Sequence, residues 1–267
     1  MSTPLNRDQI LEEMGIAPRW VLRDPATANR SAAAENCVRP VASVAPVAVI
    51  AEAQVGEAAP VNPQQSVSPV TEARSEVGKL DWESLRQSIA SCRACGLCAE
   101  RRQAVPGVGD ENASWLFIGE GPGAEEDARG EPFVGQAGKL LDAMLAAIDL
   151  KRGEDVYIAN AVKCRPPGNR TPEADEIAVC FPYLQRQIEL IQPKLIVLLG
   201  RVAVTSVLAQ DGSLSSLRGK ALSYRAGDRD IPVVVTYHPA YLLRNLPDKA
   251  KAWEDLCRAR ALMRSLR

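Results

Sequence analysis

Residues 114–162, SWLFIGEGPGAEEDARGEPFVGQAGKLLDAMLAAIDLKRGEDVYIANAV, have the pattern of a strand–helix–strand unit. The first part, SWLFIGE, is a short apolar run that stops at Gly-Pro-Gly, which is typical of a buried strand that leads into a loop. From Gly138 onward GKLLDAMLAAIDL has helical periodicity, and DVYIANAV is a second apolar strand. A strand, a helix and a strand in this order predict parallel strands in one sheet.

The same alternation continues on both sides of this unit. A helix is expected over 81–92, and another over 172–190 with Pro172 at its first position and acidic residues in its first turn. KLIVLLG (194–200) and IPVVVTYH (231–238) are further apolar strands, the first followed by a helix, and a last helix fills 248–266. The pattern predicts an α/β fold with three layers, in which helices cover a central, mostly parallel sheet of four strands.

The N-terminal part of the chain has a different composition. Residues 24–79 are rich in Ala, Val, Pro, Ser and Gln and nearly lack aromatic residues, so they predict a disordered linker. Within residues 1–23 the apolar spacing fits either a short amphipathic docking helix for another protein or a frayed terminus. Residues 80–267 are the predicted folded domain, and the extension before it is expected to be disordered.

Charge and hydropathy limit the classes of function. The net charge of −1 argues against a protein that coats DNA, but not against an enzyme that touches a few phosphates. The basic excess of residues 244–267 fits a solvated helix face or a face that follows DNA. The start of the chain lacks the pattern of a signal peptide and no stretch has transmembrane length, so we expect a cytoplasmic protein without membrane contact.

Four of the seven cysteines form two distant pairs, Cys92-x2-Cys95 and Cys164-x15-Cys180, whereas the chain has a single histidine, His238. In a cytosolic protein such cysteines indicate metal ligands and buried thiols rather than disulfides. A site with thiolate ligands alone is typical of iron–sulfur clusters, although an all-cysteine zinc site is also possible. The sequence therefore predicts a thiolate metal site.

Polar side chains follow three of the predicted strands. Glu120 follows the first strand, Asn160 closes the second, and His238 closes the strand before the last helix. Ligands bind beyond the carboxyl ends of strands in such sheets, so this edge is the candidate site. Phe133, in a loop flanked by Gly and Pro, could stack on a flat heterocycle or pack as a satellite core residue.

Several motifs together resemble the family 4 uracil-DNA glycosylases, which are iron–sulfur enzymes of base excision repair. The matching blocks are GEGPG with PFVG, then VYIANAVKCRPPGNR, then HPAYLLR, and the cysteine positions match as well. The resemblance covers residues 92–244 and implies a uracil-DNA glycosylase-like fold. It implies a [4Fe-4S] cluster on the paired cysteines and leaves Cys37, Cys98 and Cys257 as bystanders. A ferredoxin-like cluster that includes Cys98 would need a compact fourth Cys followed by Pro, which is absent.

The resemblance also implies a role for each site residue in the hydrolysis of uracil from DNA. Phe133 would stack on an everted uracil, and the Asn160 amide would pair with its O4 and N3 edge. His238 would stabilise the negative charge that develops on the departing base. HPAYLLR would be the loop that enters the minor groove, with Leu242 as the wedge and Arg244 as a phosphate or groove contact.

Gly121 stands where the family 1 enzymes carry an aspartate. The nearest carboxylate is then Glu120, which either orients the water and stabilises the sugar cation or braces the loop through backbone hydrogen bonds. The subgroup that traps uracil DNA covalently uses a histidine in an inserted loop after the second strand, and this chain lacks both.

The expected partner is uracil-containing DNA, single- or double-stranded, and the protein is expected to be a monomer. The alternative is a non-catalytic nucleic-acid-binding protein with a four-cysteine metal site that holds zinc. If a cluster is present, its role is structural or, alternatively, redox sensing.

Overall fold

The computed structural model describes residues 76–210 and 212–266, which belong to one compact unit. The docking helix expected within 1–23 and nearly all of the linker expected over 24–79 lie outside the described residues. Of that linker, residues 76 and 77 are helical and 78 and 79 form a turn.

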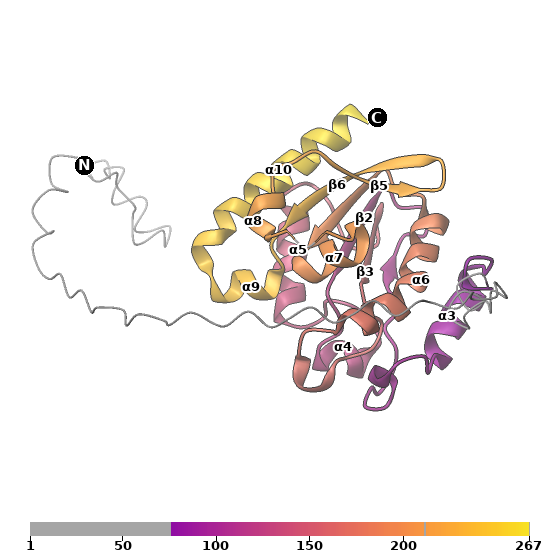
Figure 1. Ribbon diagram of the computed structural model, residues 1–267. Helices are drawn as coiled ribbons and strands as arrows, with labels where there is room; N and C mark the ends of the chain where they lie inside the picture. Colours follow the sequence, from indigo (N-terminus) through magenta and orange to yellow (C-terminus); the bar gives the residue numbers. More distant parts are fainter. Residues whose placement is uncertain (1–75, 211, 267) are drawn as a thin grey trace, which may run out of the picture. The chain divides into compact units, whose positions relative to one another are not determined.

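A six-stranded sheet forms the centre of the fold, in the order β1-β3-β2-β4-β6-β5 (Figure 1). The four central strands run parallel to one another and are the four that the sequence predicted. The expected strand number was wrong, because two short strands add to the edges in antiparallel orientation. The strands are β1 (Val108–Gly109), β2 (Trp115–Gly119), β3 (Val156–Asn160), β4 (Leu195–Leu199), β5 (Leu222–Ala226) and β6 (Arg229–Thr236).

The register of the parallel strands brings their carboxyl ends to one edge. Gly119 of β2 lies opposite Asn160 of β3, and Leu199 of β4 lies opposite Thr236 of β6. Residues that follow these four positions therefore emerge side by side. This edge is the place where a ligand site is expected in an open parallel sheet.

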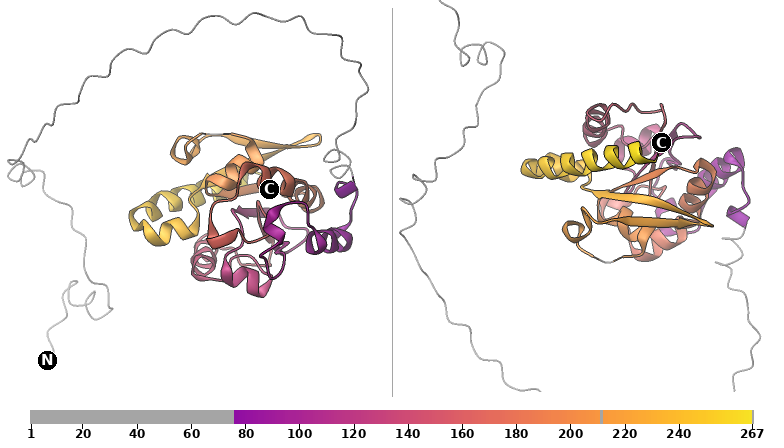
Figure 2. Two further views of the ribbon diagram at one scale, coloured as in Figure 1. Left: turned by 60° about the horizontal axis from the view of Figure 1, so that its bottom comes forward. Right: turned by 90° about the horizontal axis from the view of Figure 1, so that it is seen from above.

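Helices cover both faces of the sheet, so the predicted three layers are confirmed (Figure 2). On one face α6 (Ala174–Ile191) and α7 (Arg201–Leu208) bury Leu184, Ile188 and Val204 against the strands. On the other face α5 (Gln136–Ala146) and α10 (Lys249–Ser265) bury apolar side chains of their own. The strands have both faces buried, which explains why they are continuous apolar runs in the sequence.

Most of the predicted helices begin close to the expected residues. The helix expected over 81–92 is α3 (Trp82–Ser91), because the Asp81 side chain caps it by accepting from Ser84 N at 2.9 Å. The helix predicted from Pro172 begins two residues later, since Glu176 Oε2 accepts from Glu173 N and thereby makes Glu173 the N-cap. The other short helices are η2 (Gly96–Cys98), α4 (Ala124–Arg129), η3 (Pro167–Asn169), α8 (Leu214–Leu217), α9 (Pro239–Arg244) and η4 (Leu246–Asp248).

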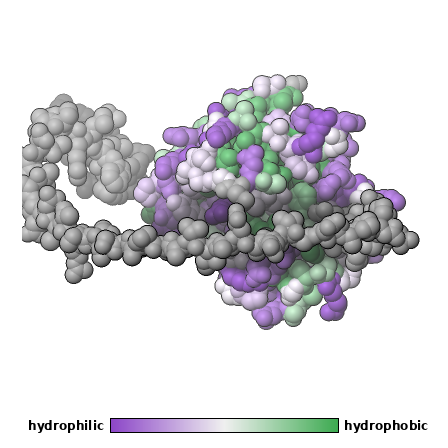
Figure 3. Space-filling model, viewed as in Figure 1, coloured by the Kyte–Doolittle hydropathy of each residue, from purple (hydrophilic) through white to green (hydrophobic). Residues whose placement is uncertain are grey.

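The surface is predominantly polar on the face seen in Figure 3, where hydrophilic residues surround a smaller hydrophobic area. Among the described residues, no helix has the length and apolar character needed to cross a membrane.

Candidate functional site

A cavity of about 580 Å³ opens at the carboxyl edge of the parallel strands. It brings together most of the side chains that the sequence singled out, although they come from four separate parts of the chain. Its lining includes Glu120, Gly121, Phe133, Asn160, His238 and Arg244. Leu242 is the one predicted substrate or DNA residue that does not line it.

Asn160 ends β3, lines this cavity and is 2% exposed. Its side-chain oxygen Oδ1 is buried and has no hydrogen-bond partner. Buried polar atoms are nearly always paired in folded proteins, so an unpaired acceptor that lines a cavity suggests that a ligand supplies the donor. Its backbone carbonyl is held separately, by the Nζ of the buried Lys163 at 2.8 Å.

Phe133 lies beside Asn160 and is almost fully buried. A Cβ built on Gly119 would lie 2.5 Å from both the Phe133 ring and Asn160 Oδ1, so only glycine lets these two side chains pack together here. The ring centroid of Phe133 lies 5.4 Å from that of His238. The three groups therefore line one part of the cavity, where Phe133 supplies an aromatic surface.

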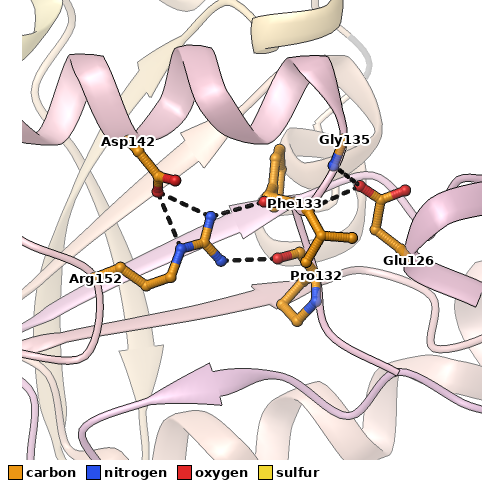
Figure 4. Close-up of polar contacts among 7 residues, drawn as sticks. Glu126, Pro132, Phe133, Gly135, Asp142 and Arg152 are labelled. Carbon is orange, nitrogen blue, oxygen red and sulfur yellow. Dashed lines mark hydrogen bonds and ion pairs between the residues drawn. The ribbon is translucent and has the colours of Figure 1, made fainter. Parts of the chain in front are cut away.

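The backbone of Phe133 adopts φ 56°, the left-handed region that costs a bulky residue about 1–2 kcal/mol. Figure 4 shows how its loop is held from both sides. Glu126 Oε1 accepts from the backbone N–H groups of Val134 and Gly135, at 2.9 and 3.1 Å. On the other side, the Arg152 guanidinium donates to the carbonyl oxygens of Pro132 and Phe133, each at 2.8 Å.

His238 is the N-cap of α9, and its Nδ1 accepts from Ala240 N at 3.1 Å. An imidazole nitrogen that accepts carries no proton, so the neutral ring carries its proton on Nε2. Burial lowers the pKa of His238 to about 4, and the positive charge of Arg244 adds to this effect while Glu126 opposes it. The side chain is therefore a neutral donor at physiological pH.

Glu120 follows β2 and is half-buried at the cavity wall, and burial raises the pKa of its carboxyl group. Within the described residues its carboxylate makes no hydrogen bond to the backbone. The carboxylate that braces this loop is Glu126, whose Oε2 also accepts from Gly123 N. Glu120 is thus left free to act on a molecule in the cavity.

The segment HPAYLLR contains the helix α9 rather than a loop, which corrects the expectation from the sequence. The helical turn points Leu242 inward, where it is 1% exposed and packs with Tyr237 and Ala252. Its neighbour Leu243 is 42% exposed. A wedge must be accessible to DNA, so this placement argues against Leu242 and favours Leu243.

Arg201 and Tyr241 also line the cavity, although neither was predicted from the sequence as a site residue. Arg201 follows Gly200, just beyond the carboxyl end of β4. Ligands bind beyond the carboxyl ends of such strands, so the position of Arg201 after the apolar run 194–200 was a usable signal. Tyr241 could not be placed without knowing that its segment is helical. Its hydroxyl donates to Asp248 Oδ2 at 2.6 Å, which ties α9 to the residues that follow it.

The four paired cysteines gather in a second place, where α3, the end of β3 and α6 meet. Cys164 and Cys180 are buried, and Cys92 and Cys95 pack against the same apolar cluster. No three His, Cys, Asp or Glu side chains in the described part of the chain are close enough to hold one metal ion. Four cysteine thiolates are the usual ligand set of an iron–sulfur cluster, in which each thiolate binds a different iron.

Two of these thiols accept hydrogen bonds. Arg101 Nη1 donates to Cys164 Sγ at 2.8 Å, and the backbone N–H of Lys163 donates to Cys180 Sγ at 3.3 Å. Burial raises the pKa of Cys164, and Arg101 opposes that rise. A donor set of four thiols with nearby cations fits an anionic thiolate-ligated cluster. Cys98 is half-buried beside this group, and Cys257 is exposed.

Sequence similarity to known proteins identifies the class of this protein. The model of the uracil DNA glycosylase superfamily matches residues 106–257. Over 177 residues, 65% of this chain and 80% of the relative, the chain is 45% identical to a type-4 uracil-DNA glycosylase of Sulfurisphaera tokodaii. It is 46% identical over 165 residues, 60% of this chain and 82% of the relative, to the type-4 enzyme of Archaeoglobus fulgidus. A type-5 uracil-DNA glycosylase of Thermus thermophilus is 32% identical over 179 residues, 55% of this chain and 80% of the relative. The chain belongs to the uracil-DNA glycosylase superfamily and, within it, to the type-4 family.

Proposed function

We propose that this protein removes uracil from DNA by hydrolysing the N-glycosidic bond and leaves an abasic site for base excision repair. The observation that carries the proposal is the convergence of Phe133, Asn160 and His238 on one cavity. An enzyme that acts on a base needs a pocket that stacks the extruded ring and reads its Watson–Crick edge. These three side chains are of the types that such a pocket requires.

Recognition of uracil rests on Asn160 and Phe133. The unpaired Oδ1 accepts from N3–H of uracil while the amide nitrogen donates to O4. Cytosine has no N3–H and carries an amino group at C4, so it presents the reversed pattern and leaves buried groups unpaired. Phe133 supplies the flat surface on which the ring stacks.

Bond cleavage leaves negative charge on uracil and positive charge on the sugar. The Nε2–H of neutral His238 donates to uracil O2, where charge accumulates as the bond breaks. Glu120 accepts a proton from the attacking water or stabilises the sugar cation. Gly121, beside it, leaves room in the cavity wall where a larger side chain would meet Val162.

Replacing Glu120 with Gln is expected to lower kcat by about 100-fold, because the amide cannot accept the proton. Burial raises the pKa of Glu120 above its ordinary value of 4.5, so the wild-type rate is expected to fall, as the pH is lowered, at a pH above 4.5. The rate of the Glu120→Gln variant should not show this fall at low pH, because glutamine does not titrate. Single-turnover rates across the pH range measure both effects, and near-normal excision by the Gln variant would remove Glu120 from the mechanism.

Contact with DNA rests on the cavity rim. Leu243 enters the base stack as the wedge, while Arg244 and Arg201 bind phosphates.

Replacing Leu243 with Ala is expected to slow excision from double-stranded DNA about 10-fold, because only the duplex must be opened. The rate of excision from single-stranded DNA should stay nearly unchanged. The buried Leu242 is unsuitable as a control, but the exposed Leu246 is suitable. Equal losses on both substrates would contradict the wedge role.

The four paired cysteines are the proposed ligands of a [4Fe-4S] cluster with a structural role. When bound, the cluster would be held by Cys92, Cys95, Cys164 and Cys180, and its iron–thiolate bonds would cross-link the segments around α3, β3 and α6. Replacing Cys164 with Ser is expected to abolish the brown colour and lower the melting temperature by about 10 °C, whereas Cys257→Ser should change neither. Iron analysis distinguishes a cluster from zinc. A DNA affinity that depends on the cluster's oxidation state would instead support redox sensing.

The function is tested with single- and double-stranded oligonucleotides that contain one U, T or C. Abasic sites from U alone are the expected result. Binding without abasic sites would favour the non-catalytic alternative. The monomeric state, the cytoplasmic location and a docking role for residues 1–23 stay predictions.

A further inference from the structure

We propose that Arg152, which lies outside the cavity, is a positioning residue for excision and acts through Phe133. The inference rests on the stacking role given to Phe133 in the proposed function. Arg152 lies in the turn between α5 and β3, and its side chain does not line the cavity. Its guanidinium points instead at the back of the loop that carries the aromatic ring (Figure 4).

The guanidinium has the geometry of a clamp. Two of its nitrogens donate to two successive carbonyl oxygens, those of Pro132 and Phe133, each at 2.8 Å. Its Nε donates to Asp142 Oδ1 of α5 at 3.0 Å, which fixes the plane of the group. Only a planar fork can reach both carbonyls and the carboxylate together, so lysine cannot replace it.

Arg152 holds the backbone at Phe133, where the conformation is unfavourable for a bulky residue. Phe133 is the bulkiest of the non-glycine residues with positive φ in the described part of the chain, and it relaxes toward negative φ if nothing opposes this. Its carbonyl is also pressed against Gly138, where an added Cβ would lie 1.8 Å from the oxygen. Glycine at 138 permits the close approach, and Arg152 supplies the attraction that keeps it.

A change in the backbone at Phe133 rotates its ring away from Asn160 and His238. The position of the ring depends on this backbone, because in the native conformation the ring fits closely between Gly119 and the imidazole of His238, whose centroid lies 5.4 Å away. Misplacement of a reacting group by about 1 Å can reduce a rate by up to about 100-fold. Arg152 therefore sets the stacking surface without touching the substrate.

The test is a double-mutant cycle on kcat/KM for uracil excision. Arg152→Gln is expected to reduce kcat/KM about 10-fold in the wild-type background and to have almost no further effect in Phe133→Ala, because the group through which it acts is gone. Arg152→Lys, which keeps the charge, should resemble the Gln variant. The matched control is Arg225→Gln, because Arg225 also binds a carbonyl and an aspartate but lies on an edge strand.

Three results would overturn the proposal or its basis in distinguishable ways. An unchanged Phe133→Ala enzyme would refute the stacking role in the proposed function. An impaired Phe133→Ala enzyme with an unchanged Arg152→Gln enzyme would refute only the role of Arg152. Equal losses from Arg152→Gln in both backgrounds would show that Arg152 acts by general stabilisation, and melting temperatures of all variants check this. If Arg152→Gln does not fold, the same cycle with Arg152→Lys decides.

Discussion

Replacing Asn160 with Ala is expected to lower kcat/KM for uracil excision by about 1,000-fold. The substitution removes both hydrogen bonds to the base edge, and a site built to pair with a polar edge loses selectivity and rate when that pairing is removed. The melting temperature should change little, because Oδ1 has no protein partner to lose. Single-turnover excision and thermal unfolding of the same preparation measure the two quantities.

Asn160→Asp separates shape from hydrogen bonding. The carboxylate keeps the size of the amide but cannot donate to uracil O4, so this variant should lose about as much activity on uracil as the Ala variant. Asn112→Ala, at an exposed position away from the cavity, is the control and should leave the rate unchanged. A loss below about 3-fold in Asn160→Ala would contradict the recognition role.

The central strands and the site edge were predictable because both follow from burial. The strands β2, β3, β4 and β6 are buried on both faces and therefore appear as apolar runs, and their ends define where the site residues emerge. The edge strands were not predictable in this way. β1 has only two residues, and β5 alternates between exposed and half-buried positions, so neither has a strong apolar signal.

The site residues that the sequence misplaced depend on contacts between distant segments. HPAYLLR is too short for helical periodicity to be recognised, so the choice between Leu242 and Leu243 could not be made from spacing. Likewise, nothing in the local sequence indicates that Arg152 and Glu126 hold the loop of Phe133. The residue types of the site could be predicted, but the groups that fix their orientation could not.

Substitution of His238 is expected to have the second large effect on the rate of excision, and the titration of its imidazole can be observed directly. The pKa of about 4 predicts that its imidazole stays neutral between about pH 5 and pH 8. The folded state resists protonation and the unfolded state does not, so His238 lowers stability as the pH falls from the ordinary value of 6.5 toward 4. Because the chain has one histidine, its NMR signals need no assignment.

Replacing His238 with Asn is expected to lower kcat by about 100- to 1,000-fold with little loss of stability. Asparagine is a favourable N-cap, so its side-chain oxygen can take over the hydrogen bond from Ala240 N that caps α9. It is too short to place a donor where Nε2 lies, so the stabilisation of negative charge on uracil O2 is lost. His238→Ala loses the cap as well and should be both slow and less stable. Single-turnover rates and melting temperatures of the two variants separate these roles. An Asn variant that kept more than about a third of the wild-type kcat would show that His238 caps the helix and takes no part in catalysis. A wild-type imidazole that titrated near 6.5 would contradict only the lowered pKa.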